Sequence, residues 1–326
     1  MRQKMDNTNT LTIVVPCYNE EEVLPETVKE LSTLLKKMQE DGKVSSASKI
    51  LFVNDGSRDK TWQLISEYTE KYPWVTGIKF SRNYGHQNAL LAGMTTAVDY
   101  SDMIITIDAD LQDDVNAIPK MVDKYLAGYD VVYGVRNNRD TDTWFKRQTA
   151  LAFYSLMKKL GVNLVPDSAD YRLLSQRATR SLLQFSERNL FLRAMVPLVG
   201  YKSTKVYYAR KERFAGESKY PLKKMIAFAT DGITSFSIAP IHLILWFGIL
   251  IMLVSLLFMV YVLVEKIGGN TVSGWSSLMM SIWFLGGAQL VAISVIGEYV
   301  GKVFTEAKRR PRFTIETETY TNKMKR

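Results

Sequence analysis

Two long segments near the C-terminus contain no charged residue, and they constrain this chain more than any other feature. The first is Leu243–Val264 and the second is Ile267–Gly297, whose apolar part begins near Trp275. Each exceeds the roughly 20 residues that an α-helix needs to cross a bilayer core of about 30 Å. We therefore predict two transmembrane helices. The alternative is a buried helical hairpin in a soluble core.

Basic residues around these segments predict their orientation. Three lysines precede the first segment: Lys219, Lys223 and Lys224. Five basic residues follow the second: Lys302, Lys308, Arg309, Arg310 and Arg312. The loop between the segments has one, Lys266. By the positive-inside rule, both termini lie in the cytoplasm. Residues Met1–Thr10 are polar and show no signal peptide. We expect a multi-pass protein of the plasma membrane with its N-terminal region in the cytoplasm.

The segment just before the first span is amphipathic. Tyr220–Pro240 places Met225, Ile226 and Phe228 among polar residues. This pattern predicts a helix lying in the membrane interface. The alternative is a core helix of the preceding domain.

The N-terminal two-thirds alternates short apolar runs with longer amphipathic stretches. The apolar runs predict strands at Leu11–Pro16, Lys49–Asp55, Val75–Phe80, Met103–Asp108 and Asp130–Gly134. Helix-like stretches lie between them at Glu21–Glu40, Thr61–Lys71, Gln87–Val98 and Asn116–Leu126. This alternation predicts an α/β fold with a mostly parallel sheet. Ligands of such sheets bind beyond the carboxyl ends of the strands.

The formal net charge of +9 indicates a polyanionic partner. Nucleic acid, an anionic membrane and phosphorylated substrates all fit this charge. The hydrophobic C-terminal third favours the lipid bilayer, and no nucleic-acid-binding motif is present, so we expect no nucleic-acid partner. The single cysteine, Cys17, excludes an intrachain disulfide and is interpreted as a small apolar residue at a strand end.

Two aspartates follow the fourth predicted strand. Asp108 and Asp110 are separated by one residue, so their carboxylates can converge on one hard cation. Such a cation can also bind a diphosphate and offset the charge of a leaving group. On its own this spacing is also typical of an ordinary polar turn.

Three other strand ends carry polar motifs. They are Val14–Glu20, Val53–Thr61 and Ser81–Gly85. In the second, Asp55 can accept the imide N–H of a uracil ring, and Gly56 permits a tight exit from the strand. His86 follows the third motif and lies near a nucleotide or caps a helix. Together with the two aspartates after the fourth strand, these motifs place polar residues at four strand ends, which we expect to form the rim of one pocket.

These motifs together resemble glycosyltransferase family 2, in the subgroup of dolichol-phosphate mannose synthase and bacterial polyprenyl-phosphate glucosyltransferases. The matching segments are P-C-Y-N-E, N-D-G-S-R-D-x-T, S-R-N-x-G, D-A-D-L-Q-D, V-Y-G-V-R, D-Y-R-L-L and R-F-A-G-E-S-K-Y. The resemblance covers nearly the whole chain. It implies a GT-A-type, Rossmann-like domain followed by interfacial helices and two transmembrane helices.

The resemblance also implies roles for donor-side residues. Pro16, Tyr18, Glu20 and Asp55 hold the uridine of a UDP-sugar. A Mg²⁺ or Mn²⁺ ion and the diphosphate are bound by Asp108 and Asp110, with Gln112 as a further metal contact. The family usually has proline where this chain has Asp114, and no role is assigned to that residue.

On the acceptor side, Asp170 resembles the family's aspartate that is often called the catalytic base. A phosphate monoester has its second pKa near about 6 and needs little deprotonation at neutral pH. We therefore expect Asp170 to position the phosphate or sugar; the alternative is a helix N-cap before Arg172. Cations must offset the repulsion between two phosphorylated substrates. The candidates for binding the lipid phosphate are Arg136, Arg139, Arg172, Arg213 and Lys219, with Ser218 as a hydrogen-bond donor.

The predicted reaction is an inverting transfer of a hexose from a UDP-sugar to polyprenyl (undecaprenyl) phosphate, for a cell-envelope glycan. Glucose is favoured as the hexose, with N-acetylglucosamine next. The alternatives are a UDP-sugar transferase with a glycan or protein acceptor, and a non-catalytic membrane scaffold. The predicted organisation is a catalytic domain at 1–219, an interfacial region at 220–240, two spans at 241–301 and a basic tail at 302–326. A homo-oligomer is compatible with Gly286-Gly287 and Gly297…Gly301, which allow close helix packing.

Overall fold

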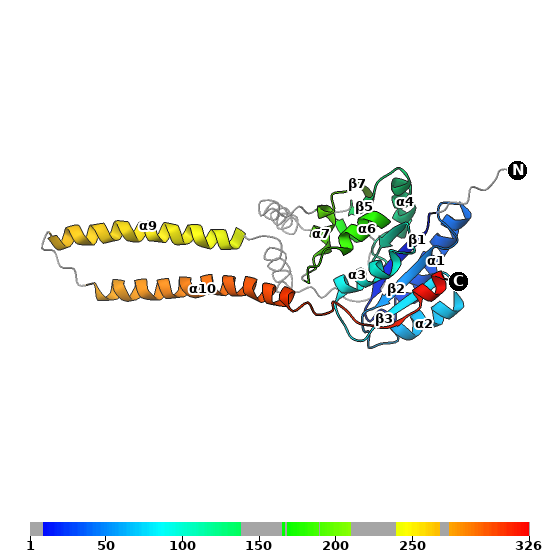
Figure 1. The fold of residues 1–326 in the computed structure, drawn as a ribbon, viewed down its shortest axis with the longest axis horizontal. Coiled ribbons are helices and arrows are strands. Elements are labelled where there is room, and N and C mark those ends of the chain that lie inside the picture. Colours follow the sequence, from blue (N-terminus) through cyan, green and yellow to red (C-terminus); the bar gives the residue numbers. More distant parts are fainter. Residues whose placement is uncertain are drawn as a thin grey trace. The chain divides into compact units, whose positions relative to one another are not determined.

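The computed structural model of the protein describes residues 9–137, 165–166, 168–188, 190–209, 239–267 and 274–325. The chain divides into two units. One unit holds the N-terminal α/β region together with the C-terminal residues Arg310–Arg326, and the other holds the two long helices α9 and α10 (Figure 1). Almost all of the predicted interfacial segment at 220–240 lies outside the described residues.

In the described part of the chain, the α/β unit is built on an eight-stranded sheet with the order β7-β5-β6-β4-β1-β2-β3-β8. The pairs β1–β2, β2–β3, β1–β4 and β5–β7 are parallel, whereas β3–β8, β4–β6 and β5–β6 are antiparallel. The predicted α/β fold is confirmed, and the sheet is mixed with parallel pairs in the majority. The strands are Leu11–Cys17 (β1), Lys49–Asn54 (β2), Val75–Phe80 (β3), Met103–Thr106 (β4), Val131–Arg136 (β5), Ser168–Ser175 (β6), Ser203–Tyr208 (β7) and Ile315–Glu318 (β8).

Helices cover both faces of this sheet (Figure 1). Helices α1, α2 and α4 pack on one face, and α3, α6 and α7 pack on the other. In α1 the buried side chains of Leu24, Val28, Leu31 and Leu35 recur at helical spacing and form one apolar stripe. The helices of this unit are Leu24–Glu40 (α1), Thr61–Lys71 (α2), His86–Ala97 (α3), Val115–Ala117 (η1, a 3₁₀ turn), Ile118–Leu126 (α4), Gln176–Leu183 (α6), Leu192–Leu198 (α7) and Tyr320–Met324 (α11).

The strand directions gather many strand ends at one edge of the sheet. Parallel strands β1 to β4 all finish there, as the sequence predicts. Strand β6 runs the opposite way beside β4, with Thr106 opposite Arg172, so β6 begins at the edge where β4 ends. The hydroxyl of Thr106 donates to the backbone oxygen of Asp170, 2.5 Å away. This register brings a residue from an antiparallel strand to the rim of the predicted pocket.

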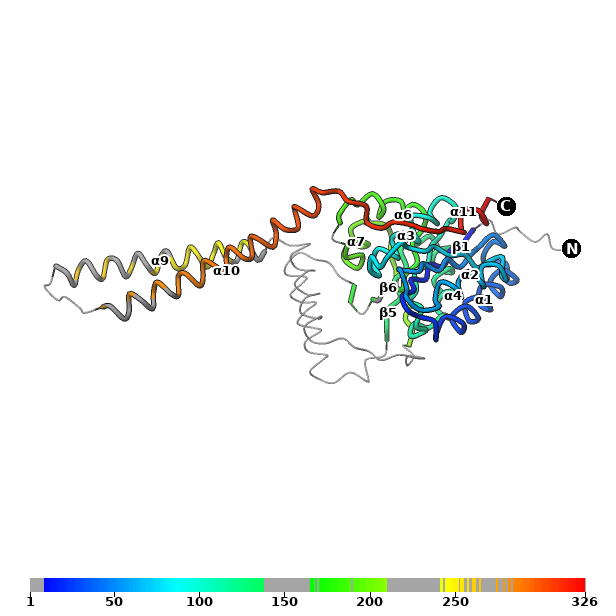
Figure 2. The backbone as a smooth tube through the Cα atoms, turned by 90° about the horizontal axis from the view of Figure 1, so that it is seen from below, coloured from blue at the N-terminus to red at the C-terminus, as the bar shows by residue number. Residues whose placement is uncertain are grey.

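The C-terminal residues form part of the α/β unit, so the predicted separate tail at 302–326 needs correction. Strand β8 pairs with β3. Helix α11, labelled in Figure 2, follows it. Tyr320 of α11 is fully buried, and its hydroxyl bonds those of Thr12 at 2.7 Å and Ser101 at 3.1 Å. The basic composition of residues 302–326 predicted a cytoplasmic tail separate from the catalytic domain. Instead, burial of Tyr320 and pairing of β8 with the edge strand β3 hold this segment in the α/β unit.

The other unit contains helices α9 (Ala239–Ile267) and α10 (Trp275–Ala307). The first predicted apolar segment is therefore helical, and so is the second from Trp275 onward. Within the described residues, the segment Phe284–Ala307 of α10 is long and apolar enough to cross a membrane. None of its apolar window is buried inside the protein, in contrast to the core helix of a soluble protein. A long apolar helix suggests association with a membrane, while the crossing of a bilayer by α9 and by α10 stays a prediction.

Candidate active site

The two aspartates of the predicted cation site follow β4 directly. The backbone turns sharply here, because Leu111 has a positive φ of 55° and the Gln112 N–H donates to Asp110 Oδ1 at 3.2 Å. The Oδ1 atom of Asp108 has no hydrogen-bond partner within the described part of the chain. The pKa of Asp108 is raised to about 6, because burial and the charges of neighbouring carboxylates together outweigh the lowering effect of nearby His86.

The arrangement fits a cation that is completed by a substrate. In the described ranges, no group of three or more His, Cys, Asp or Glu side chains is arranged to hold a metal ion. Mg²⁺ is commonly held by one or two carboxylates plus substrate phosphates, so Asp108 and Asp110 would suffice with a diphosphate present. The Oδ1 of Asp108, which accepts no hydrogen bond in the described residues, and the carboxylates around it match such a site, because a cation would offset their mutual repulsion.

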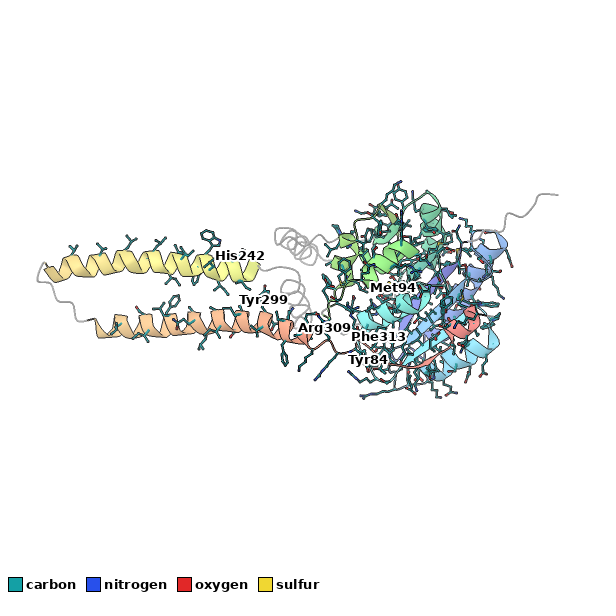
Figure 3. All side chains as sticks on the ribbon, in the orientation of Figure 1. Tyr84, Met94, His242, Tyr299, Arg309 and Phe313 are labelled. Atoms are coloured by element: carbon teal, nitrogen blue, oxygen red, sulfur yellow. The ribbon has the colours of Figure 1, made fainter. Side chains whose placement is uncertain are left out.

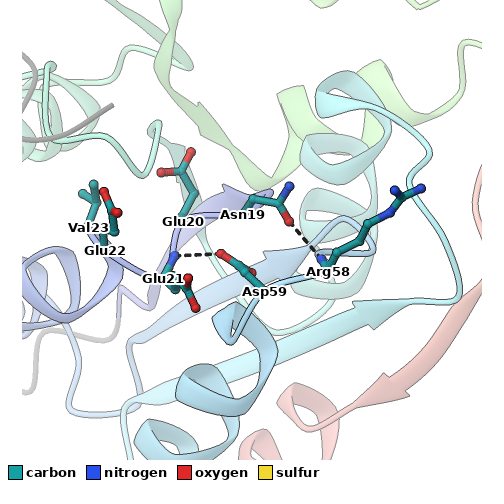
Figure 4. Close-up of a pocket in the computed structure, with 7 residues that line it drawn as sticks. All are labelled: Asn19, Glu20, Glu21, Glu22, Val23, Arg58 and Asp59. Atoms are coloured by element: carbon teal, nitrogen blue, oxygen red, sulfur yellow. Dashed lines mark hydrogen bonds between the residues drawn. The ribbon is translucent and has the colours of Figure 1, made fainter. Parts of the chain in front are cut away.

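The loops after β1 and β2 are hydrogen-bonded to each other. Asn19, whose φ is 55°, accepts the Arg58 N–H on its Oδ1 at 2.9 Å. The Glu21 N–H donates to Asp59 Oδ2 at 3.1 Å, as Figure 4 shows. The Glu20 N–H donates to the hydroxyl of Thr61 at 2.8 Å. A hollow lies between these loops and is lined by Asn19, Glu20, Glu21, Glu22, Val23, Arg58 and Asp59.

Three predicted uridine-binding residues lie in or next to this first loop. Pro16 is within β1, opposite Val53 of β2. Tyr18 is 43% exposed and Glu20 lines the hollow, so both side chains are accessible to a ligand. The structure therefore brings them together at the strand edge, while their contact with uridine stays a prediction.

Asp55 holds the loop that follows β3. Its Oδ1 accepts the Tyr84 N–H at 2.6 Å, and its Oδ2 accepts the Gly85 N–H at 2.9 Å. Burial raises the pKa of Asp55, and these two bonds and the charge of His86 offset only part of that rise. Each carboxylate oxygen has a second lone pair, so Asp55 can still accept a uracil N–H. Its structural role is to join two strand-end loops.

Replacing Gly56 by Ala is expected to destabilise this pair of loops. Gly56 has a φ of +64°, and an added Cβ would lie 2.3 Å from the backbone carbon of Arg82. We expect a loss of about 2 kcal/mol or more in the free energy of unfolding, measured by denaturant titration. Gly42→Ala is the matched control, since its φ is +68° but nothing lies within 4 Å of the added Cβ. Equal losses in the two variants would contradict the role given to the Arg82 contact.

Asp113 and Asp114 both have structural partners. Asp113 is buried, and its Oδ1 accepts from Arg136 Nη2 at 3.0 Å and from the Tyr208 hydroxyl at 2.6 Å. Arg136 is therefore paired with a carboxylate, and its binding to a lipid phosphate stays a prediction. Asp114, which stands where the family usually has proline, caps the 3₁₀ turn η1 by accepting the Asn116 N–H at 3.2 Å. This cap is the role that sequence reasoning did not assign.

Asp170 lies in β6 beside the cation site, so its interpretation as a helix N-cap is wrong. The N-cap of the following helix α6 is Ser175. Oδ1 of Asp170 pairs with Arg172, which is 3% exposed, and Oδ2 lies 3.5 Å from His86 Nε2. Burial by itself would raise the pKa of Asp170. The hydrogen bond from His86 and the charges of Arg172 and Arg193 outweigh it and hold this pKa well below its usual range.

Two side chains at this edge were not among the predicted site residues. His86 begins α3, its Nε2 lies 3.6 Å from Asp108 Oδ1, and Gly85 takes the N-cap position, so the helix-cap interpretation of His86 is also wrong. Arg193 lies in α7 with its Nε 3.7 Å from Asp170 Oδ1. The sequence gives a signal for His86, because this residue directly follows the S-R-N-x-G segment. No motif marks Arg193. The predicted residues Arg139, Arg213, Ser218 and Lys219 lie outside the described residues.

Comparison with known proteins identifies the family. The model of glycosyl transferase family 2 matches residues 12–183. The uncharacterized glycosyltransferase YkoT of Bacillus subtilis (strain 168) is 50% identical over 314 residues, which cover 96% of this chain and 93% of that protein. Bactoprenol glucosyl transferase of Shigella phage SfV is 38% identical over 313 residues, covering 94% and 98%. The predicted resemblance is confirmed: this chain belongs to glycosyltransferase family 2.

Proposed function

We propose that the protein transfers a hexose from a UDP-sugar to the phosphate of a polyprenyl lipid. Relatives 38% identical over most of the chain are bactoprenol glucosyl transferases, which supports glucose as the sugar and a bactoprenol-type acceptor. The observation that carries the proposal is the register of β4 and β6. This register sets Asp170 and its cationic partners beside Asp108. At this edge of the sheet, the carboxylates of Asp108 and Asp110 would serve the UDP-sugar, and the cations around Asp170 would serve the acceptor phosphate.

The proposed chemistry is a single displacement. An oxygen of the acceptor phosphate forms a bond to the anomeric carbon while the bond from that carbon to UDP breaks, which inverts the configuration. Asp108 and Asp110, with Gln112 next to them, would hold a Mg²⁺ or Mn²⁺ ion that offsets the negative charge on departing UDP. The acceptor phosphate is already mostly dianionic at neutral pH, so the step requires no strong base.

Donor recognition is assigned to the first two strand-end loops. In this proposal Pro16, Tyr18 and Glu20 surround the uridine, and Asp55 accepts the uracil imide N–H with the lone pairs that Tyr84 and Gly85 leave open. Arg58 and Asp59 complete the rim of the same hollow.

The proposed setting is the cytoplasmic face of the plasma membrane. A long apolar helix supports membrane association. We propose that both α9 and α10 cross the bilayer, that both termini are cytoplasmic, and that the region at 220–240 lies at the interface. The isoprenoid chain could then stay in the bilayer while only its phosphate reaches the site. We therefore propose a catalytic domain of residues 1–219 together with 310–326, and a membrane region of two helices at residues 241–301.

The test is UDP release by the detergent-purified full chain. The reaction contains UDP-glucose or UDP-N-acetylglucosamine, Mg²⁺ or Mn²⁺, and undecaprenyl phosphate or undecaprenol. We expect release that requires a metal ion and the phosphate of the lipid, with UDP-glucose preferred. Undecaprenol is the matched control because it lacks only the phosphate.

Other outcomes would favour the alternative functions. Release that is indifferent to the lipid would favour a glycan or protein acceptor. The absence of release with either donor, combined with retained lipid binding, would favour a non-catalytic scaffold.

A further inference from the structure

Asp170 is surrounded by more positive charge than it can neutralise. Arg172 pairs with its Oδ1, the Nε of Arg193 is 3.7 Å from the same atom, and the Nε2 of His86 is 3.5 Å from Oδ2. One carboxylate thus faces two guanidinium groups and an imidazole. Asp108 lies beside the same imidazole, so two carboxylates face the two guanidinium groups and the imidazole. A cation held by Asp108 would offset its charge and leave the guanidinium groups in excess over Asp170, which favours binding of an anion.

Solvent exposure separates these cations into two kinds. The side chain of Arg172 is 4% exposed, and its Nη1 donates to the backbone oxygen of Leu192 at 3.2 Å, so it is a buried counter-ion. The side chains of Arg193 and His86 are 38% and 42% exposed. Of the three cations, these two are accessible to a ligand from solvent.

The exposed pair is held in place by its neighbours. Gln87 donates through Nε2 to Asp170 Oδ2 at 3.4 Å and accepts the Leu192 N–H on Oε1 at 3.0 Å. It therefore ties the start of α3, which carries His86, to the start of α7, which carries Arg193. Such prior ordering reduces the entropy that is lost when a ligand binds.

The exposed pair also lies next to the donor side of the site. The Nε2 of His86 is 3.6 Å from Oδ1 of Asp108, an atom with no hydrogen-bond partner in the described residues. An anion held by His86 and Arg193 would therefore lie beside the predicted metal and diphosphate. This is where an attacking phosphate must be placed for a displacement at the anomeric carbon.

We infer that Arg193 and His86 bind the phosphate of the acceptor lipid, and that Asp170 is a positioning residue that holds both of them at the reacting edge. The inference rests on the proposed function and deepens it by naming the acceptor site. Both oxygens of Asp170 already face cationic or amide donors, which leaves its carboxylate committed to this positioning. Arg172, one of the predicted phosphate ligands, is assigned to the buried support.

The test uses Arg193→Gln, Arg193→Lys and His86→Gln in the detergent-purified full chain. We expect Arg193→Gln and His86→Gln each to raise the KM for undecaprenyl phosphate about 10- to 100-fold, the size of one or two charged hydrogen bonds. The KM for the UDP-sugar should stay within about twofold. Arg193→Lys should recover part of the loss, because it keeps the charge but not the guanidinium fork.

Arg180→Gln is the matched control. Arg180 is an exposed arginine of α6 that pairs with Asp99 at 3.0 Å. Its replacement by Gln should leave the KM values for the lipid and for the UDP-sugar unchanged. An unchanged acceptor KM in Arg193→Gln, or a parallel rise in the donor KM, would overturn the inference.

Direct binding separates this inference from the proposed function. Native mass spectrometry would compare undecaprenyl phosphate with undecaprenol on the wild-type chain and on Arg193→Gln. A preference for the phosphate that is lost in Arg193→Gln supports the site, even if the wild-type chain transfers no sugar and the proposed function fails. A wild-type chain that does not distinguish the two lipids overturns the site, even if lipid-dependent sugar transfer is observed.

Discussion

Replacing Asp110 by Asn is expected to reduce the rate of sugar transfer by at least about 100-fold. Asp110 and Asp108 are the two carboxylates at the end of β4, and among the described residues no third His, Cys, Asp or Glu joins them in an arrangement that could hold a metal ion. Loss of one of two anionic ligands therefore removes a large share of the cation's attraction. The same reasoning predicts a comparable loss for Asp108→Asn. The measurement is steady-state UDP release at saturating donor and lipid.

Two controls distinguish loss of the cation from loss of the fold. Asp123→Asn removes an aspartate that is 54% exposed on α4 and pairs with Lys43, so its activity should match that of the wild-type chain. The Asp110→Asn chain should unfold at the wild-type temperature. If it kept wild-type activity, or if chelating the metal left wild-type turnover unchanged, the role of these aspartates in holding a cation would be refuted.

Replacing Tyr320 by Ala is expected to cost about 3–5 kcal/mol of stability in the α/β unit. Tyr320 is fully buried, its ring packs edge-on against Tyr100 with centroids 6.0 Å apart, and its hydroxyl bonds Thr12 and Ser101. Alanine would leave a cavity and remove all of these contacts. In a unit of this size the loss corresponds to a fall of roughly 6–20 °C in Tm, measured by thermal unfolding in detergent.

Tyr320→Phe keeps the ring and removes only the hydroxyl, so its cost should be near about 1 kcal/mol. Tyr207→Ala removes a tyrosine that is 57% exposed on β7 and should change stability by less than about 0.5 kcal/mol. A Tyr320→Ala chain with the wild-type Tm would show that the C-terminal segment is dispensable for the fold.

Removal of the C-terminal segment should also disturb the loop Ser81–Gly85, which directly precedes His86. The ring of Phe313 stacks on Phe80 at 5.3 Å, Phe80 meets Tyr84 at 5.6 Å, and the Ser81 N–H donates to the Thr314 oxygen at 3.2 Å (Figure 3). Because Asp55 binds the backbone of Tyr84 and Gly85, these contacts reach from the end of the chain to the donor loops. A stretch of sequence that reads as a basic tail thus supports the candidate site.

Much of the fold could be predicted because its signals are local. Strands β1 to β4 and helices α1 to α4 follow from runs of apolar residues with a period of two or 3.6. The predicted strand Val75–Phe80 and helix Thr61–Lys71 have the observed bounds. Strands β6, β7 and β8 were not predicted, because each depends on pairing with a distant partner. Strand β8 pairs with β3, more than 200 residues earlier in the chain.

The candidate site divides in the same way. Asp55, Asp108 and Asp110 could be placed at one edge from sequence, because the carboxyl ends of parallel strands meet there. The partners of Arg136 and Arg172 could not be foreseen. Both arginines looked like solvent-facing phosphate ligands, and the fold pairs them with Asp113 and Asp170.

The sequence by itself determined the strand–helix alternation, the two long apolar segments and the strand-end motifs of a glycosyltransferase of family 2, because each depends on residues close together in the chain. Only the tertiary structure decided that β6 runs antiparallel to β4, which sets Asp170 beside Asp108 and collects His86 and Arg193 around it. It also decided that the C-terminal residues complete the sheet. The physical reason is that register and charge pairing are set by contacts between residues distant in the sequence, as between Thr106 and Arg172 or between His86 and Asp170, which no local pattern records.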